Sequence, residues 1–421
     1  MRFPELYRIR QRVPEEALED VEGALEAEVS RTSILDGIGQ GSKVLIGAGS
    51  RGIPNYPAVI RKLAELLRDR GASVSILPAM GSHGGGHGPG QVQVLAELGI
   101  TPETVGAPVV ETMEVVSIGK TPCGIPVCAD KSLTEADGVI LVNRIKEHTE
   151  FHGRIESGLL KMMAIGLGRY KGAVTTHEYA VEFGYEQAIR EVSRRCMEEL
   201  PILGGIALVD GADNRTARVE AVLPPDMAAA ETRLLKLARH YTLKLPLDAV
   251  DVLIVDEMGK NVSGAGMDTK VIGRIMNIYE QELTSPHITR IVVRDLTPET
   301  AGNAIGIGLA DYTTQRLVDK IDLEVTNLNA VAAVAPEKGR IPITLPDDKQ
   351  ALTAALQTIG PKDEESIRLL WIRNTSSLVE LMASAAAYSA IHPSRIAGVE
   401  GPMEMRFGED GNLLSPWTKG S

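Results

Sequence analysis

A strand–helix–strand unit near the start of the chain limits the fold more than any other feature. Two short aliphatic runs, "KVLIGAG" (43–49) and "ASVSILPAM" (72–80), read as buried strands. Between them, "YPAVIRKLAELLRDRG" (56–71) repeats apolar residues every three or four positions, with proline in its first turn and glycine at its end. This order predicts two parallel strands joined by a right-handed crossover.

The same alternation continues along the chain. The pattern predicts further strands at 136–144, 203–211, 250–259 and 288–296, helices at 225–241 and 376–391, and an extended segment at 396–407. A length of 421 residues exceeds the usual size of one core. We therefore expect the α/β class: two α/β domains, 1–245 and 246–421, with mostly parallel sheets and an active-site cleft between them.

Composition excludes several classes of protein. The aromatic content is 4% against 43% hydrophobic residues, so the cores must be aliphatic. A net charge of -12 disfavours nucleic acid and anionic membranes as partners. No apolar run approaches the roughly 20 residues of a membrane helix, and the charged start lacks the apolar core of a signal peptide. The three cysteines fit no disulfide framework or zinc spacing, and we expect a cytoplasmic protein.

Histidines are concentrated in one part of the chain. Five of the eight lie between residues 81 and 177, in or beside loops that follow predicted strands: His83, His87, His148, His152 and His177. Ligands of open α/β sheets bind at such loops. The clustering indicates a functional site.

Two glycine-rich loops follow the first two strands. "GAGSRGIPNYP" lets the backbone approach a ligand, and Arg51 offers a planar cation for a carboxylate or phosphate, although a plain turn would look the same. "GSHGGGHGPG" carries His83 at the strand end and His87 further along. His83 is the better catalytic candidate, whereas a flexible turn or an incidental metal-binding pair would also fit. His87 has no assigned role.

The stretch 143–180 is the richest in candidate groups. Lys161 of "SGLLK" stands among leucines and methionines, where a lysine either extends its amine to solvent or is buried with a lowered pKa, ready for covalent chemistry. "IGLGRYKG" then adds a glycine-rich turn compatible with an anion. In the second half, a polar loop at 256–274 carries Lys260 and Lys270, which could deliver a cation to an acidic substrate.

These motifs, taken in order, resemble the nickel-dependent lactate racemase family of 2-hydroxyacid racemases and epimerases. "SRGIP" is similar to the family's arginine loop and matches Arg51, and "GSH" matches His83 to a catalytic histidine. The second catalytic histidine follows a later strand, as His148 does here. "SGLLK" is similar to the family's lysine motif and matches Lys161, with His177 one glycine-rich turn later.

The resemblance implies a cofactor, the nickel-pincer nucleotide (pyridinium-3,5-bisthiocarboxylic acid mononucleotide). Lys161 would hold it covalently as a thioamide, and His177 would be the protein ligand of nickel. Ser50, Gly166 and Gly168 would line the cofactor. Imidazole and soft sulfur suit nickel in a square-planar site.

The resemblance also implies a reaction, the racemisation or epimerisation of a small 2-hydroxyacid by hydride transfer to the cofactor. His83 and His148 would act as acid and base, while Arg51 and either Lys260 or Lys270 would hold the carboxylate. Enzymes that mature the cofactor would then be partners. The sequence does not decide the oligomeric state, and a homo-oligomer is compatible with it.

The chain departs from the family pattern in places. Ala48 and Gly49 replace an aspartate, Gly84 replaces an arginine, and "SGLLK" has one glycine where the family has two. About three extra residues follow His148, so that His152 competes for the second catalytic role. Two other functions stay open: a nucleotide-dependent oxidoreductase or lyase on the same fold, and a non-catalytic nucleotide or metal binder.

Overall fold

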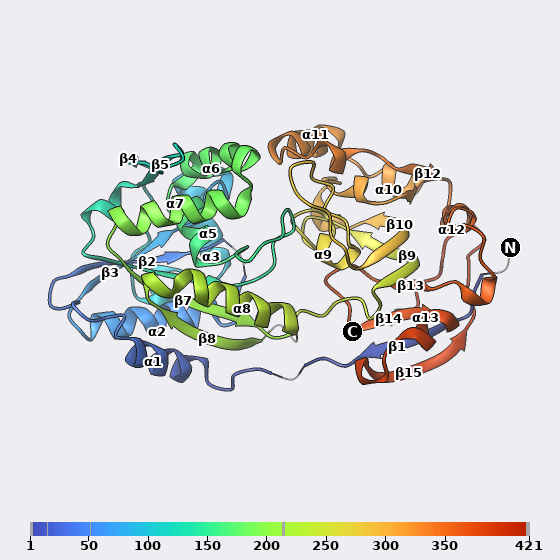
Figure 1. Cartoon of the computed structure of the whole chain (residues 1–421), viewed down its shortest axis with the longest axis horizontal. Coiled ribbons are helices and arrows are strands. Elements are labelled where there is room, and N and C mark those ends of the chain that lie inside the picture. Colours follow the sequence, from blue (N-terminus) through green and yellow to red (C-terminus); the bar gives the residue numbers. More distant parts are fainter. Residues whose placement is uncertain (1–2, 15, 51, 213–214, 418–421) are drawn as a thin grey trace. The chain divides into compact units, whose positions relative to one another are not determined.

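A computed structural model describes residues 3–14, 16–50, 52–212 and 215–417 of the chain (Figure 1). The described residues form two compact units. The N-terminal unit spans Pro14–His148 and His152–Thr242. The C-terminal unit contains the residues from Leu243 onward, the residues up to Val13, and the short segment Thr149–Phe151.

The N-terminal unit is built on a sheet of order β3-β2-β6-β7-β8. The first four strands in this order run parallel, and β8 is antiparallel to β7. The strands are β2 (Lys43–Ala48), β3 (Ser73–Pro78), β6 (Gly138–Arg144), β7 (Ile202–Asp210) and β8 (Thr216–Val222). A separate hairpin pairs β4 (Val115–Lys120) with β5 (Pro126–Asp130).

Helices cover both faces of this sheet. In Figure 1, α1 and α2 lie on one side of it and α6 and α7 on the other. The helices are α1 (Val21–Thr32), α2 (Tyr56–Arg68), α3 (Gly88–Glu97), α4 (Pro102–Val105), α5 (Leu159–Lys161), α6 (Arg169–Phe183), α7 (Tyr185–Glu199) and α8 (Met227–Tyr241).

The predicted strand–helix–strand unit is confirmed. Strands β2 and β3 pair in parallel, with Lys43 opposite Ser73, and α2 connects them. The apolar stripe of α2 is fully buried in an aliphatic core shared with α1 and the sheet. Burial of this stripe, at roughly 25 cal/mol for each Å² of apolar surface, explains why the periodicity predicted the helix.

The C-terminal unit is built on a sheet of order β12-β11-β10-β9-β13-β14-β1-β15. From β12 to β13 the neighbours pair in parallel, and the remaining pairs are antiparallel. The strands are β1 (Leu6–Gln11), β9 (Ala249–Met258), β10 (His287–Leu296), β11 (Tyr312–Thr314), β12 (Ile343–Leu345), β13 (Leu369–Ile372), β14 (Glu380–Ser384) and β15 (Ile396–Met403). The helices are α9 (Thr269–Ile272), α10 (Gln315–Val318), α11 (Leu323–Ala332), α12 (Asp348–Gln357) and α13 (Ala385–Ala390). Both units are therefore α/β with mostly parallel central strands, and the predicted fold class is confirmed.

The predicted helix over 376–391 is wrong in its first half. Residues Glu380–Ser384 form β14, which pairs antiparallel with β1 and β13, and the helix α13 begins after it. Ser384 caps that helix by accepting a hydrogen bond from the Ala387 N–H at 3.2 Å. Pairing with the neighbouring β13 and with the distant β1 overrides the local helix preference of this alanine-rich stretch.

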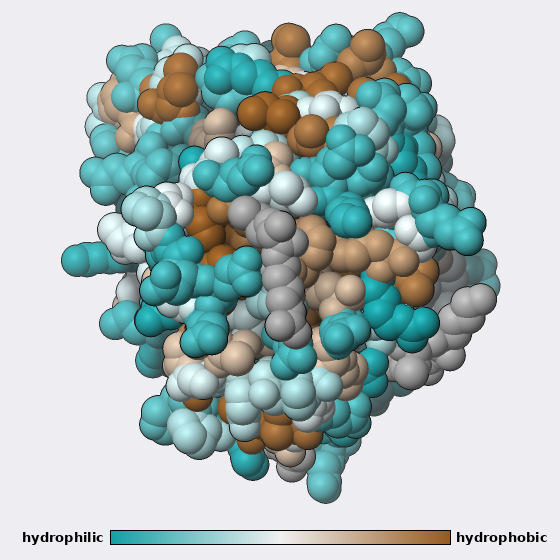
Figure 2. Space-filling view, turned by 90° about the vertical axis from the view of Figure 1, so that its right-hand side faces the viewer, coloured by the Kyte–Doolittle hydropathy of each residue, from teal (hydrophilic) through white to brown (hydrophobic). Residues whose placement is uncertain are grey.

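The surface of the C-terminal unit mixes polar and apolar groups (Figure 2). Its most exposed large apolar side chains include Leu328, Val331 and Ile278, each about 71–72% exposed. Among the described residues, no helix is both long and apolar enough to span a membrane.

Candidate active site

The loops that carry the predicted site residues leave one edge of the N-terminal sheet. Strands β2, β3 and β6 are parallel neighbours, so their carboxyl ends meet at that edge. Gly49 and Ser50 follow β2, His83 follows β3, and the loop with His148 follows β6. The buried Tyr56 hydroxyl ties two of these ends together, because it accepts from the Gly49 N–H at 2.7 Å and donates to a β6 carbonyl at 2.9 Å.

The His83 ring is anchored through one nitrogen. Its Nδ1 lies 2.9 Å from the Met80 carbonyl oxygen and 3.0 Å from the Ser50 hydroxyl. A carbonyl oxygen can only accept, so the contact with Met80 puts the proton on Nδ1. The lone pair of the neutral ring is then on Nε2, which is the arrangement a general base needs.

The glycines around His83 allow a tight fold of the backbone. Gly84 has φ +64°, and a Cβ there would lie 2.5 Å from the Gly90 carbonyl carbon. His87 caps the helix α3, because its Nδ1 accepts from the Gly90 N–H at 3.1 Å. The structure thus gives His87 a local structural role.

Lys161 ends a short helical turn held from two sides. The Asn143 side chain, at the end of β6, donates to the Gly158 carbonyl at 2.8 Å. Glu231 of α8 accepts from the Leu160 N–H at 2.7 Å. A Cβ at Gly158 would lie 2.5 Å from a Glu231 carboxylate oxygen, so the glycine lets this carboxylate approach the turn closely. The turn continues into a π-helix, Met162–Gly166, of the kind often found at functional sites.

His177 of α6 is close enough to Lys161 to feel its charge. Burial, and next the positive charge of Lys161, lower the pKa of His177 to about 4. The ring is therefore neutral at neutral pH and can offer a lone pair to a metal.

Tyr185 links two of the predicted histidines. Its hydroxyl lies 3.3 Å from His177 Nδ1, and its ring is also 5.7 Å from the His177 ring, edge to face. The His148 ring also stacks against Tyr185, with the two ring centroids 6.4 Å apart. The structure thus brings His148 and His177 together around one aromatic side chain at the start of α7.

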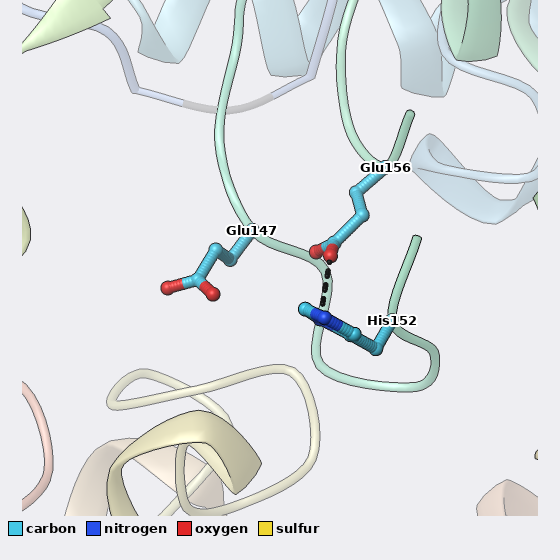
Figure 3. A group of neighbouring side chains, drawn as sticks. All are labelled: Glu147, His152 and Glu156. Carbon is cyan, nitrogen blue, oxygen red and sulfur yellow. Dashed lines mark ion pairs between the residues drawn. The ribbon is translucent and has the colours of Figure 1, made fainter. Parts of the chain in front are cut away.

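His152 has different neighbours. Its Nδ1 lies 3.2 Å from Glu156, and its side chain is 52% exposed. Figure 3 shows the His152 ring turned toward the Glu156 carboxylate, with Glu147 directed away from that contact. Ligand atoms of these three residues lie within 4.8 Å of one another. Arg239 already pairs with both carboxylates, at 3.2 Å from Glu147 and 2.6 Å from Glu156, so the acidic charge has a counterion.

The predicted glycine contacts have a packing explanation. A Cβ at Gly166 would lie 2.4 Å from the Ala79 carbonyl oxygen, and one at Gly168 would lie 2.7 Å from Gly172 Cα. These glycines let the loop after β3, the π-helix and α6 approach closely. Ser50 contacts His83, as described above. Arg51 lies outside the described residues.

The two candidate lysines of the C-terminal unit differ in burial. Lys270 of α9 is 6% exposed, and its Nζ donates to the Phe151 carbonyl at 2.8 Å. The neighbouring Thr269 hydroxyl donates to the Thr149 carbonyl at 2.6 Å, so these two side chains hold the short segment Thr149–Phe151. Lys260 is partly exposed, and its Nζ donates to the Gly264 carbonyl at 2.9 Å.

Sequence reasoning missed three residues that organise the site: Tyr185, Glu231 and Gln91. The first two carried a weak signal, because Tyr185 begins a helix directly after a glycine and Glu231 is the one acidic residue in a run of alanines and leucines. Gln91 carried none, since a glutamine in an amphipathic helix normally faces solvent.

Comparisons with known proteins identify the fold by its similarity to solved structures. No protein-family model matches the chain, and no curated protein matches it in sequence. Eight chains of solved structures match in shape, among them the following two. One is the lactate racemase apoprotein of Thermoanaerobacterium thermosaccharolyticum, with 14% identity, a TM-score of 0.53, and coverage of 88% of this chain and 99% of that one. The other is a structural-genomics target from Thermotoga maritima, with 15% identity, a TM-score of 0.52, and coverage of 86% and 99%. The chain therefore has a lactate racemase-like fold.

Proposed function

We propose that the chain is a racemase or epimerase of a small 2-hydroxyacid that works with a nickel-pincer nucleotide bound to Lys161. One observation carries this proposal. A partly buried, neutral His177 feels the charge of Lys161 and shares Tyr185 with His148. The lactate racemase-like fold supports the same assignment.

The chemistry of the donor set fits this cofactor. A neutral imidazole is a nickel ligand, and a lysine amine is the group that forms a thioamide. A Cβ at Gly49 would lie 3.3 Å from the Met162 methyl group and 3.4 Å from the Asn143 amide oxygen, so glycine there lets the start of the Lys161 turn pack closely against the end of β2. When bound, the nucleotide would supply a carbon able to take a hydride from C2 of the substrate and return it.

The chain's own residues would move the hydroxyl proton. With Nδ1 held by Met80, His83 presents Nε2 as the base for one enantiomer. We assign the same task for the other enantiomer to His148, because its ring shares Tyr185 with the proposed nickel ligand. His152 is bound instead to Glu156, beside Arg239, which favours a structural role.

A carboxylate substrate needs a cation. Between the two candidate lysines we favour Lys260, because it is partly exposed whereas Lys270 is buried. Arg51 remains the proposed partner for the carboxylate from the first loop.

The test uses protein co-expressed with enzymes that make the cofactor. We expect intact mass to show an adduct that tryptic mapping assigns to Lys161, one nickel per chain, and racemisation of a hydroxyacid in a chiral screen. The Lys161→Arg variant, which keeps the charge, should lose the adduct. The His177→Ala variant should keep the adduct and lose nickel.

The two alternative functions predict other outcomes. An oxidoreductase or lyase would bind a dissociable nucleotide and turn over a substrate without an adduct. A non-catalytic binder would show neither turnover nor adduct. Matured protein that lacks both the adduct and nickel would overturn our proposal.

A further inference from the structure

We infer that Gln91 is a positioning residue for His83, held in place by a buried Arg169–Asp130 ion pair. This inference deepens the proposed function, because the role of His83 rests on it. The restraint on the loop itself can be measured without the cofactor.

Gln91 binds the His83 loop at two points. Its side-chain amide donates to the Gly81 carbonyl at 2.7 Å and to the His83 carbonyl at 3.3 Å. The residue lies on α3, directly after the loop, and is fully buried. One amide group thus fixes the backbone on both sides of Ser82 and orients the segment from which the His83 ring projects.

Arg169 in turn fixes Gln91. Its Nη1 donates to the Gln91 amide oxygen at 2.6 Å and to the Pro78 carbonyl, at the end of β3, at 2.6 Å. Its Nε pairs with Asp130 at 2.6 Å, with 1% and 0% of the two side chains exposed. Because the amide oxygen faces a guanidinium, the amide nitrogen has to face the loop carbonyls.

The network is costly for the fold, which argues for a role beyond packing. Burying an ion pair seldom stabilises a protein more than apolar side chains of the same volume would. Arg169 also adopts φ +53°, a left-handed conformation that is strained for a non-glycine residue. Such strain persists where the surrounding structure needs one particular geometry.

Arg169 also connects the two parts of the proposed site. It is the first residue of α6, the helix that carries His177, while its contacts reach the end of β3 and, through Gln91, the His83 loop. The network thus ties the backbone of the proposed base to the helix of the proposed nickel ligand.

Two variants at Gln91 separate its functions. Gln91→Met keeps the shape and removes every side-chain hydrogen bond of this residue. Gln91→Glu can still accept from Arg169 but cannot donate to the two loop carbonyls. The matched control is Gln93→Met, an exposed position on the same helix.

Hydrogen exchange on the cofactor-free protein is the first readout. The His83 amide donates to the Met80 carbonyl at 3.2 Å and reports on the loop. We expect both Gln91 variants to speed its exchange at least about tenfold, with the amides of β3 unchanged and Gln93→Met like wild type. In loaded enzyme, both should lower kcat at least about tenfold, with little change in KM and with nickel retained.

If the His83 amide of either folded Gln91 variant exchanges at the wild-type rate, the inference is overturned. Failure of both variants to fold would do the same, because the network would then be part of the core and not a restraint on the loop. Faster exchange together with a wild-type enzyme that racemises nothing would instead refute the proposed function and leave the restraint in place.

Discussion

Replacing Glu231 by glutamine should make the protein more stable at pH 8 and leave its stability almost unchanged near pH 4.5. The Glu231 carboxyl is 1% exposed, and burial raises its pKa from 4.5 to about 7. Glutamine keeps the oxygen that accepts from the Leu160 N–H and carries no charge.

The sign and size follow from proton linkage. An acid with a raised pKa binds its proton more tightly in the folded state, so that the fold loses stability as the pH rises from 4.5 to 7. A shift from 4.5 to about 7 corresponds to about 3 kcal/mol at 1.36 kcal/mol per pKa unit. Above pH 7 wild-type protein bears this whole cost, and below pH 4.5 it bears none.

Urea unfolding at pH 4.5, 6 and 8 measures the difference. The gain of Glu231→Gln over wild type should grow across this range to about 3 kcal/mol. Glu135→Gln, an exposed carboxylate of the same unit, is the control and should show no such trend. A gain that does not depend on pH would refute the reasoning, since the buried charge would then not be the cause.

Three further predictions concern the site. His87→Ala removes the cap of α3 and should lower the free energy of unfolding by about 1 kcal/mol in urea titrations, with the chiral assay unchanged. Gly158→Ala forces a Cβ against Glu231 and should cost about 1–3 kcal/mol and reduce the yield of cofactor adduct seen by intact mass. His148→Ala should abolish racemisation with nickel retained, while His152→Ala keeps activity, and the reverse result would exchange the two roles.

The sequence predicted the parallel strands well because their signal is local. A strand buried on both faces has to be a continuous aliphatic run, as in residues Val139–Val142, all 0% exposed. The strand β14 carried no such signal. It is defined by pairing with β13 and with β1, of which β1 is remote in sequence, and "ELMAS" alone favours a helix.

The site was predictable in part for the same reason. Loops after parallel strands converge, so the order of His83, His148 and Lys161 along the chain was informative. What the sequence lacked was the partner of each side chain. Nothing in "GQVQVLAELG" distinguishes Gln91, which binds the His83 loop, from the exposed Gln93 two positions later. Helical spacing indicates a buried face but not the hydrogen bonds made there.

The choice between His148 and His152 shows what contacts add to a motif. The two histidines are four residues apart in an irregular loop, where no periodicity assigns a side chain to a face. In the structure, the three residues between them, Thr149–Phe151, belong to the C-terminal unit.

The histidines at the two ends of this segment therefore meet different neighbours. His148 meets Tyr185, which also contacts the proposed nickel ligand, and His152 meets the Glu156 carboxylate. That carboxylate also accepts from the His148 backbone N–H at 2.5 Å. Glu156 thus holds the backbone of one histidine and the ring of the other, which leaves the His148 ring as the one directed to Tyr185.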